Sequence, residues 1–233
     1  GNPLETAALV GPLVDKAAFG DVPPAVAGHA IAEGLSLGAY RYDAPRQKKA
    51  EPKKPAQVGV AGLSLTKAEG AAFARGLDDG AVFAAATAFA RDLENMPSNL
   101  CTPTHLAKEA KKLTRPRLKV KVLDKPAMSK LGMGALLGVA KGSTEPPKFL
   151  VFEYRVPGAK ENVCVIGKGL TFDTGGISIK PSGKMDEMRY DMCGGGAVMG
   201  LFHALAHGAL GSHKPKCNII GLIAATENMP GPD

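Results

Sequence analysis

Three short, almost continuously apolar segments separate helix-like stretches in the second half of the chain. They are KFLVFEYR, NVCVIGK and KCNIIGLIAAT, at residues 148–155, 162–168 and 216–226. Segments of this length and composition are typical of strands that are buried on both faces. LKVKVLD, at 118–124, alternates with a period of two and is a fourth strand candidate. The pattern predicts an α/β fold with a mixed, mostly parallel central sheet and helices on both faces.

Capping residues mark the start of two helices. Thr66 with Glu69 three residues later forms a capping box before an Ala-rich run, and this helix should end before Pro97. Thr102 followed by Pro103 fits an N-cap with a first-turn proline. Further helical patterns occur at 25–43, at 125–143 with glycine interruptions, and at about 195–210.

A Pro- and Lys-rich stretch at residues 43–56 is the best internal boundary, because it has no hydrophobic periodicity. A short strand candidate, VGVAGLSL, follows it at 58–65. We therefore predict the remnant of a smaller α/β N-terminal domain and a linker at 1–65, and a second domain at 66–233. Both ends of the chain look cut, since the first residues lack an initiator Met and the features of a signal peptide.

Charge and cysteine content narrow the class of protein. The formal net charge is +7, and six of the 29 basic residues crowd into one stretch: Arg41, Arg46, Lys48, Lys49, Lys53 and Lys54. This stretch fits a solvated linker, with a nucleic-acid or anion patch as the alternative. No apolar run approaches the roughly 18 residues of a membrane span. The four cysteines, Cys101, Cys164, Cys193 and Cys217, have no C-x-x-C spacing, which favours reduced thiols in the cytosol.

Four charged residues lie at the end of the strand candidate 162–168 and in the glycine-rich stretch after it: Lys168, Asp173, Lys180 and Asp191. Ligands of α/β sheets gather at the carboxyl ends of strands, so the position suits a binding site. Charges in such a segment are costly unless they neutralise each other or hold a metal. The residues alone leave both readings open, plain ion pairs and a metal site.

Other motifs give weaker signals. The glycines match neither a P-loop nor a dinucleotide-binding fingerprint. In HALAH, His203 and His207 stand at i and i+4, a spacing that can bind zinc, and His213 lies further on. The general-base Glu of H-E-x-x-H is absent, however, and Ala204 takes its place. A helix that packs two histidines at its surface end is the simpler interpretation.

Residues 165–200, VIGKGLTFDTGGISIKPSGKMDEMRYDMCGGGAVMG, resemble the catalytic signature of the leucyl (cytosol) aminopeptidases, dinuclear metallopeptidases that remove N-terminal residues from peptides. A looser resemblance extends to EGLSLGAYRYD, ARDLENMPSNLCTPTHLA, LGMGALLGVAKGS and GLIAATENMPG. The resemblance implies that residues 66–233 form the N-terminal part of the metallopeptidase catalytic domain.

The same resemblance implies roles for individual residues. Lys168, Asp173 and Asp191 would be metal ligands, with Asp173 bridging two ions and Lys168 binding as the neutral amine. Lys180 would be the catalytic lysine, charged and donating to the developing oxyanion. Met188 would line the pocket for the first side chain of the substrate, with plain core packing as the alternative. Two divalent ions are implied, zinc or manganese, with magnesium or cobalt as alternatives. A bicarbonate held by an Arg would be the general base.

The implied function is a metal-dependent aminopeptidase that releases leucine-like residues from peptides by a two-metal activated water. A homo-hexamer in the cytoplasm is also implied, without a membrane role. The alternative is a DNA-binding or regulatory role through the basic surface. The remaining ligands of the family, in an Asp-x-Glu-x-Arg motif, do not occur in these 233 residues. We therefore expect this segment alone to bind metals weakly and to be almost inactive.

Overall fold

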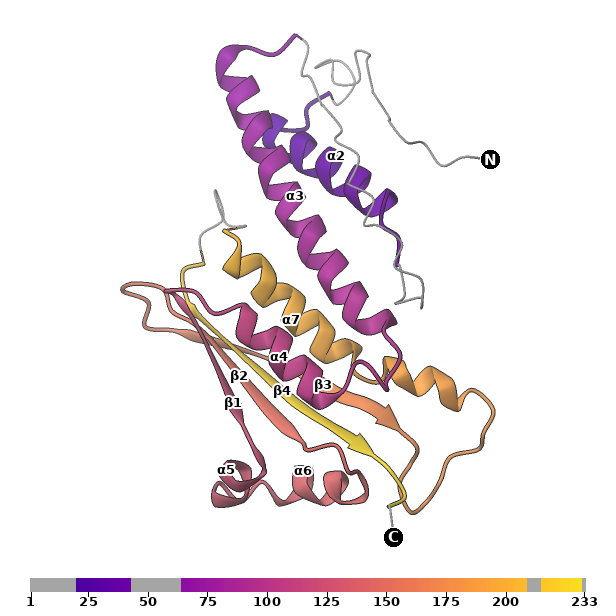
Figure 1. Cartoon of the computed structure of the whole chain (residues 1–233). Helices are drawn as coiled ribbons and strands as arrows, with labels where there is room; N and C mark the ends of the chain where they lie inside the picture. Colours follow the sequence, from indigo (N-terminus) through magenta and orange to yellow (C-terminus); the bar gives the residue numbers. More distant parts are fainter. Residues whose placement is uncertain (1–19, 43–63, 209–214, 232–233) are drawn as a thin grey trace. The chain divides into compact units, whose positions relative to one another are not determined.

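The computed structural model describes residues 20–42, 64–208 and 215–231 (Figure 1). The chain divides into two compact units, Gly1–Ala84 and Ala85–Asp233. This division falls inside one long helix, α3 (Lys67–Asn95). The domain assignment of the sequence analysis, with a boundary near residue 65, stays a prediction.

The first unit contains α2 (Pro24–Gly38) and the beginning of α3. The capping box before α3 is confirmed, because the Thr66 amide donates to Glu69 Oε2 at 2.9 Å and the Glu69 amide donates to Thr66 Oγ1 at 3.3 Å. Of the strand candidate at 58–65, residues 58–63 lie outside the described residues, and the last two are not in a strand. The basic stretch also lies outside them, apart from Arg41.

The second unit is built on a four-stranded sheet. Its strands are β1 (Leu118–Leu123), β2 (Lys148–Tyr154), β3 (Asn162–Asp173) and β4 (Asn218–Asn228), in the order β1-β2-β4-β3. The β3–β4 pairing is parallel, whereas the β1–β2 and β2–β4 pairings are antiparallel. The mixed α/β fold is confirmed, but these strands are less parallel than predicted. A central strand such as β2 is apolar in either direction, so its composition does not report its direction.

Helices pack on one face of this sheet (Figure 1). They are α4 (Pro103–Lys112), which Thr102 caps as predicted, and α7 (Cys193–Ala206). The segment between β1 and β2 forms α5 (Lys125–Lys130), α6 (Gly134–Val139) and a 3-10 turn, η1 (Ala140–Gly142). A second 3-10 segment, η2 (Met185–Tyr190), precedes α7. The glycine interruptions predicted for 125–143 are confirmed, because α5 ends at Lys130 and Gly132 separates it from α6.

The core lies between the sheet and the pair α4 and α7. The rings of Phe152 on β2 and Phe202 on α7 stack at 4.7 Å between centroids, and both side chains are fully buried. The opposite face of β3 is less covered in the described residues, since Ile166 is 76% exposed and Cys164 is also exposed. No helix within the described residues is long and apolar enough to cross a membrane.

Candidate functional site

Strand β3 is longer than predicted and carries two of the candidate residues itself. The sequence pattern indicated a strand ending near residue 168, but backbone pairing with β4 continues to Asp173. Glycines weaken a strand, so the glycine-containing segment after residue 168 has little tendency to form one by itself. Pairing with the parallel strand β4 holds it in the strand conformation. Lys168 and Asp173 are therefore strand residues and do not lie in a turn.

A bulge in β3 turns these two residues to the same face. Lys168 and Asp173 are five positions apart, and a regular strand would place them on opposite faces. The register shifts between Leu170 and Phe172, so Lys168 lies beside Ala224 and Asp173 beside Asn228, which are four positions apart on β4. The extra residue is Thr171, which is buried and donates from Oγ1 to the Thr226 carbonyl at 3.3 Å. The bulge re-aims the Asp173 side chain.

Close packing of α7 on β3 brings the second carboxylate to the same strand. A Cβ atom on Gly167 would lie 2.4 Å from the Gly194 carbonyl oxygen, so only glycine allows this approach. Asp191 lies just before α7, and its Oδ1 is 2.8 Å from Lys168 Nζ. The two side chains form an ion pair at the surface, where that of Lys168 is 60% exposed.

The loop after β3 returns the second lysine to the end of the strand. The Lys180 amide donates to the Thr174 carbonyl at 2.8 Å, which closes the loop. Its ammonium donates to Asp173 Oδ2 at 2.6 Å and contacts Met188 Sδ on η2 at 3.1 Å. Gly175 and Gly176 have φ values of +89° and +69°, a backbone conformation that favours glycine.

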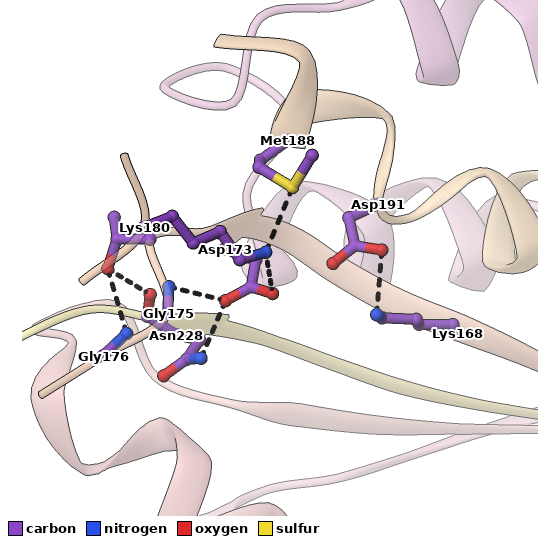
Figure 2. A network of polar contacts seen from close by, with 9 residues as sticks. Lys168, Asp173, Gly175, Gly176, Lys180, Met188, Asp191 and Asn228 are labelled. Atoms are coloured by element: carbon purple, nitrogen blue, oxygen red, sulfur yellow. Dashed lines mark hydrogen bonds and ion pairs between the residues drawn. The ribbon is translucent and has the colours of Figure 1, made fainter. Parts of the chain in front are cut away.

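Asp173 is the most heavily hydrogen-bonded of these side chains (Figure 2). Its Oδ1 accepts from the Gly175 amide at 2.9 Å and from Asn228 Nδ2 at 2.7 Å, and its Oδ2 accepts from Lys180. Burial alone would raise the pKa of this carboxyl, but these hydrogen bonds and the charge of Lys180 outweigh burial and lower the pKa. Asp173 is therefore an anion at neutral pH.

The structure brings the five predicted site residues into two groups. Lys180 joins Asp173 and Met188, and Lys168 joins Asp191. Asn228 was not among the predicted site residues, although it lies in the ENMPG segment of the resemblance. The available signal was its position at the carboxyl end of a strand candidate, but strand register is not readable from one sequence. The bridging role of Asp173 and the pocket role of Met188 stay predictions.

The chemistry of these donors suits hard divalent cations in part. Carboxylate oxygens are ligands that such ions accept, and both carboxylates here already have a cationic nitrogen within 3 Å. Among the described residues, however, no three His, Cys, Asp or Glu side chains form a cluster that could hold a metal. Asp173 and Asp191 therefore supply an incomplete ligand set, to which Lys168 could add a nitrogen only as a neutral amine.

The histidines at the other end of α7 are arranged differently. The His203 ring stacks on Phe89 at 4.8 Å and on His207 at 4.2 Å between centroids. Nδ1 of His207 faces the His203 carbonyl at 2.8 Å, and its Nε2 is 3.5 Å from the guanidinium of Arg115. Stacked rings beside a guanidinium group do not turn their nitrogens toward a shared cation. His213 lies outside the described residues.

Comparison with known proteins places the charged stretch within a family. The profile of the cytosol aminopeptidase family, catalytic domain, matches residues 88–233, more than half of the chain and all of the site above. The chain belongs to the cytosol aminopeptidase family. The family assignment inferred from residues 165–200 is thereby confirmed.

Curated relatives agree with this assignment. A protein of Aromatoleum aromaticum named "Probable cytosol aminopeptidase" is 45% identical over 204 residues, which cover 86% of this chain and 40% of the relative. A protein of Methylibium petroleiphilum with the same name is 47% identical over 206 residues, covering 87% of this chain and 41% of the relative. The chain thus spans about 40% of the length of these relatives.

Solved structures share the fold. The bottromycin maturation enzyme BotP in complex with Mn has a TM-score of 0.71 and 34% sequence identity, over 88% of this chain and 40% of that protein. A second structure of BotP gives a TM-score of 0.70 at 33% identity, with the same coverage. The likeness therefore extends to the fold of most of this chain.

Proposed function

We propose that the protein containing this chain is a metal-dependent aminopeptidase that releases N-terminal residues, leucine-like ones preferred, from peptides. The observation that carries this proposal is the position of two carboxylates that are each paired with a lysine. Asp173 is the last residue of β3, and Asp191 lies just before α7. Family membership and the similarity to BotP, whose structure is a complex with Mn, support it.

Asp173 and Asp191 would hold divalent cations through their carboxylate oxygens, with Lys168 as a further ligand in its neutral form. Bound ions of this kind supply an acidified water and polarise the scissile carbonyl. Manganese or zinc fits these ligands, and magnesium or cobalt would bind them with different strength. A homo-hexamer and a cytoplasmic location remain expectations from the family.

The remaining side chains would act on the substrate. The Lys180 ammonium is a charged donor beside Asp173, so it could donate to the carbonyl oxygen as negative charge develops there. Met188 contacts the same ammonium and could offer an apolar surface to the first side chain of the peptide. Both roles use atoms that already lie at the end of β3.

The test is a peptidase assay of the full-length protein with leucine p-nitroanilide and Mn²⁺. We expect Asp173→Asn to lower kcat/KM by about 1000-fold or more, because it removes a charged ligand. Asp186→Asn, a change of the same charge at an exposed position on η2, is the matched control and should leave turnover nearly unchanged. Full activity in the Asp173 variant would contradict the proposal.

A further inference from the structure

Asn228 lies beside Asp173 at the carboxyl end of the sheet. It is the last residue of β4, and the parallel register places it next to Asp173, the last residue of β3. Its backbone carbonyl accepts from the Thr174 amide at 2.9 Å and from Thr174 Oγ1 at 2.8 Å. The backbone of Asn228 is thus tied to Thr174, the first residue of the loop between β3 and η2, called the site loop below (residues 174–184).

The side chain of Asn228 has one orientation in this position. Its Nδ2 donates to Asp173 Oδ1 at 2.7 Å, and an ionised carboxylate can only accept, so the amide nitrogen must point toward it. On the other side, Asn228 Oδ1 lies 2.7 Å from the place where a Cβ atom of residue 176 would be. Gly176 leaves just enough room for the amide group.

The amide differs from the other strong donor to Asp173. Lys180 also donates to this carboxylate, but its positive charge would oppose a divalent cation at the same group. The Asn228 amide and the Gly175 amide are neutral, so they orient the carboxylate without this repulsion. Donors of this kind to metal-binding side chains commonly set ligand orientation.

We propose that Asn228 is a positioning residue, which holds the Asp173 carboxylate in the orientation that a divalent cation requires. This inference rests on the proposed function, in which Asp173 is a metal ligand. Asn228 itself touches neither the cation nor the substrate in this role.

The experiment measures Mn²⁺ binding to the full-length protein by titration calorimetry, with Mn²⁺ alone as the ligand. Asn228→Ala removes the side-chain donor, and Asn228→Leu removes it while keeping a branched side chain of similar size. Both variants should raise the Kd for Mn²⁺ by about 10–100-fold, the usual effect of losing such a donor. Thermal unfolding of the metal-free proteins gives a temperature at which each variant is folded, and affinities are compared there.

Asn218→Ala is the matched control, because Asn218 begins the same strand and its amide is also used in hydrogen bonds. Its Oδ1 accepts from the Val156 amide at 2.9 Å, and its Nδ2 donates to Asn162 Oδ1 at 3.1 Å. This variant should keep the Kd for Mn²⁺ within about twofold, since it changes no donor to a ligand. An equal loss of affinity in Asn218→Ala would mean that the effect is general destabilisation, and the proposal would be wrong.

Asp173→Asn separates the two possible failures. If it loses Mn²⁺ affinity while both Asn228 variants bind like the unchanged protein, the proposed function stands and the role of Asn228 is overturned. If Asp173→Asn binds Mn²⁺ normally, Asp173 is not a ligand, and both proposals fall.

Discussion

The two groups of residues that raised the possibility of a metal site in the sequence lie near opposite ends of α7. Before its N-terminus, Asp191 pairs with Lys168, and the nearby Asp173 pairs with Lys180. At its C-terminal end, His203 stacks on Phe89, and His207 stacks on His203. The first group brings carboxylate oxygens together at a surface, whereas the second stacks two imidazole rings, one of them on Phe89.

Spacing along a helix or strand is thus a weak guide to chemistry. The i, i+4 spacing of the histidines is correct for zinc, yet a guanidinium and an aromatic ring are their neighbours. The five-residue spacing of Lys168 and Asp173 is wrong for a shared strand face, yet a bulge corrects it. Partners across the fold decide what each group can bind.

Removal of the bulge should have the largest effect on the charged group. Deletion of Thr171 should restore the regular pleat of β3 and turn Asp173 to the other face of the strand. Mn²⁺ binding should then be abolished, and peptidase activity should fall by about 1000-fold. Thr171→Val keeps the extra residue and loses one hydrogen bond, so it should lower stability by about 1 kcal/mol and keep most activity.

Calorimetry with Mn²⁺ and the leucine p-nitroanilide assay check both variants, and circular dichroism verifies that the deletion variant is folded. Normal Mn²⁺ affinity in a folded deletion variant would show that the bulge does not place Asp173. The histidine end of α7 should be unaffected in both proteins.

A smaller effect is expected from two glycines with positive φ, one near the charged group and one beside the histidines. Gly176, in the site loop, has φ +69° and would bring a Cβ to 2.7 Å from Asn228 Oδ1. Gly208, just after the histidines, has φ +82° and open space around a Cβ. Gly208→Ala should cost about 1 kcal/mol of unfolding free energy for the backbone alone, and Gly176→Ala about 1–3 kcal/mol more because it also displaces Asn228.

Urea unfolding of the metal-free full-length variants measures this difference. Equal destabilisation by the two substitutions would mean that the Asn228 side chain moves aside without resistance. In that case the fixed orientation of its amide would also be in doubt.

The features of this fold that could be predicted from the sequence are those that depend on residues close together in the chain. The Thr66 capping box and the Thr102 N-cap each require only residues within one turn, and both were readable. The five predicted site residues were identified through the family resemblance, because all of them lie in one continuous stretch, residues 165–200. The bulge at Thr171, the full length of β3 and the contact of Asn228 with Asp173 depend on pairing between residues about 55 positions apart, which one sequence does not encode locally.

The smallest expected effect concerns the pH dependence of stability at the histidine end. Burial, with the charges of His207 and Arg115 adding to it, lowers the pKa of His203 to about 4. Its Nδ1 is buried and has no hydrogen-bond partner within the described part of the chain. The pKa in the unfolded chain is about 6.5, so between these values the unfolded state takes up the proton first and stability falls as pH decreases.

His203→Phe keeps an aromatic ring against Phe89 and removes this titration. Between pH 7.5 and pH 5.0 the unchanged protein should therefore lose about 1 kcal/mol more unfolding free energy than the variant, a value reduced for the solvent that reaches this half-buried ring. Urea unfolding at the two pH values measures the difference. Equal losses would mean that His203 accepts its proton without leaving the stack, and the contrast with the charged end of α7 would then rest on geometry alone.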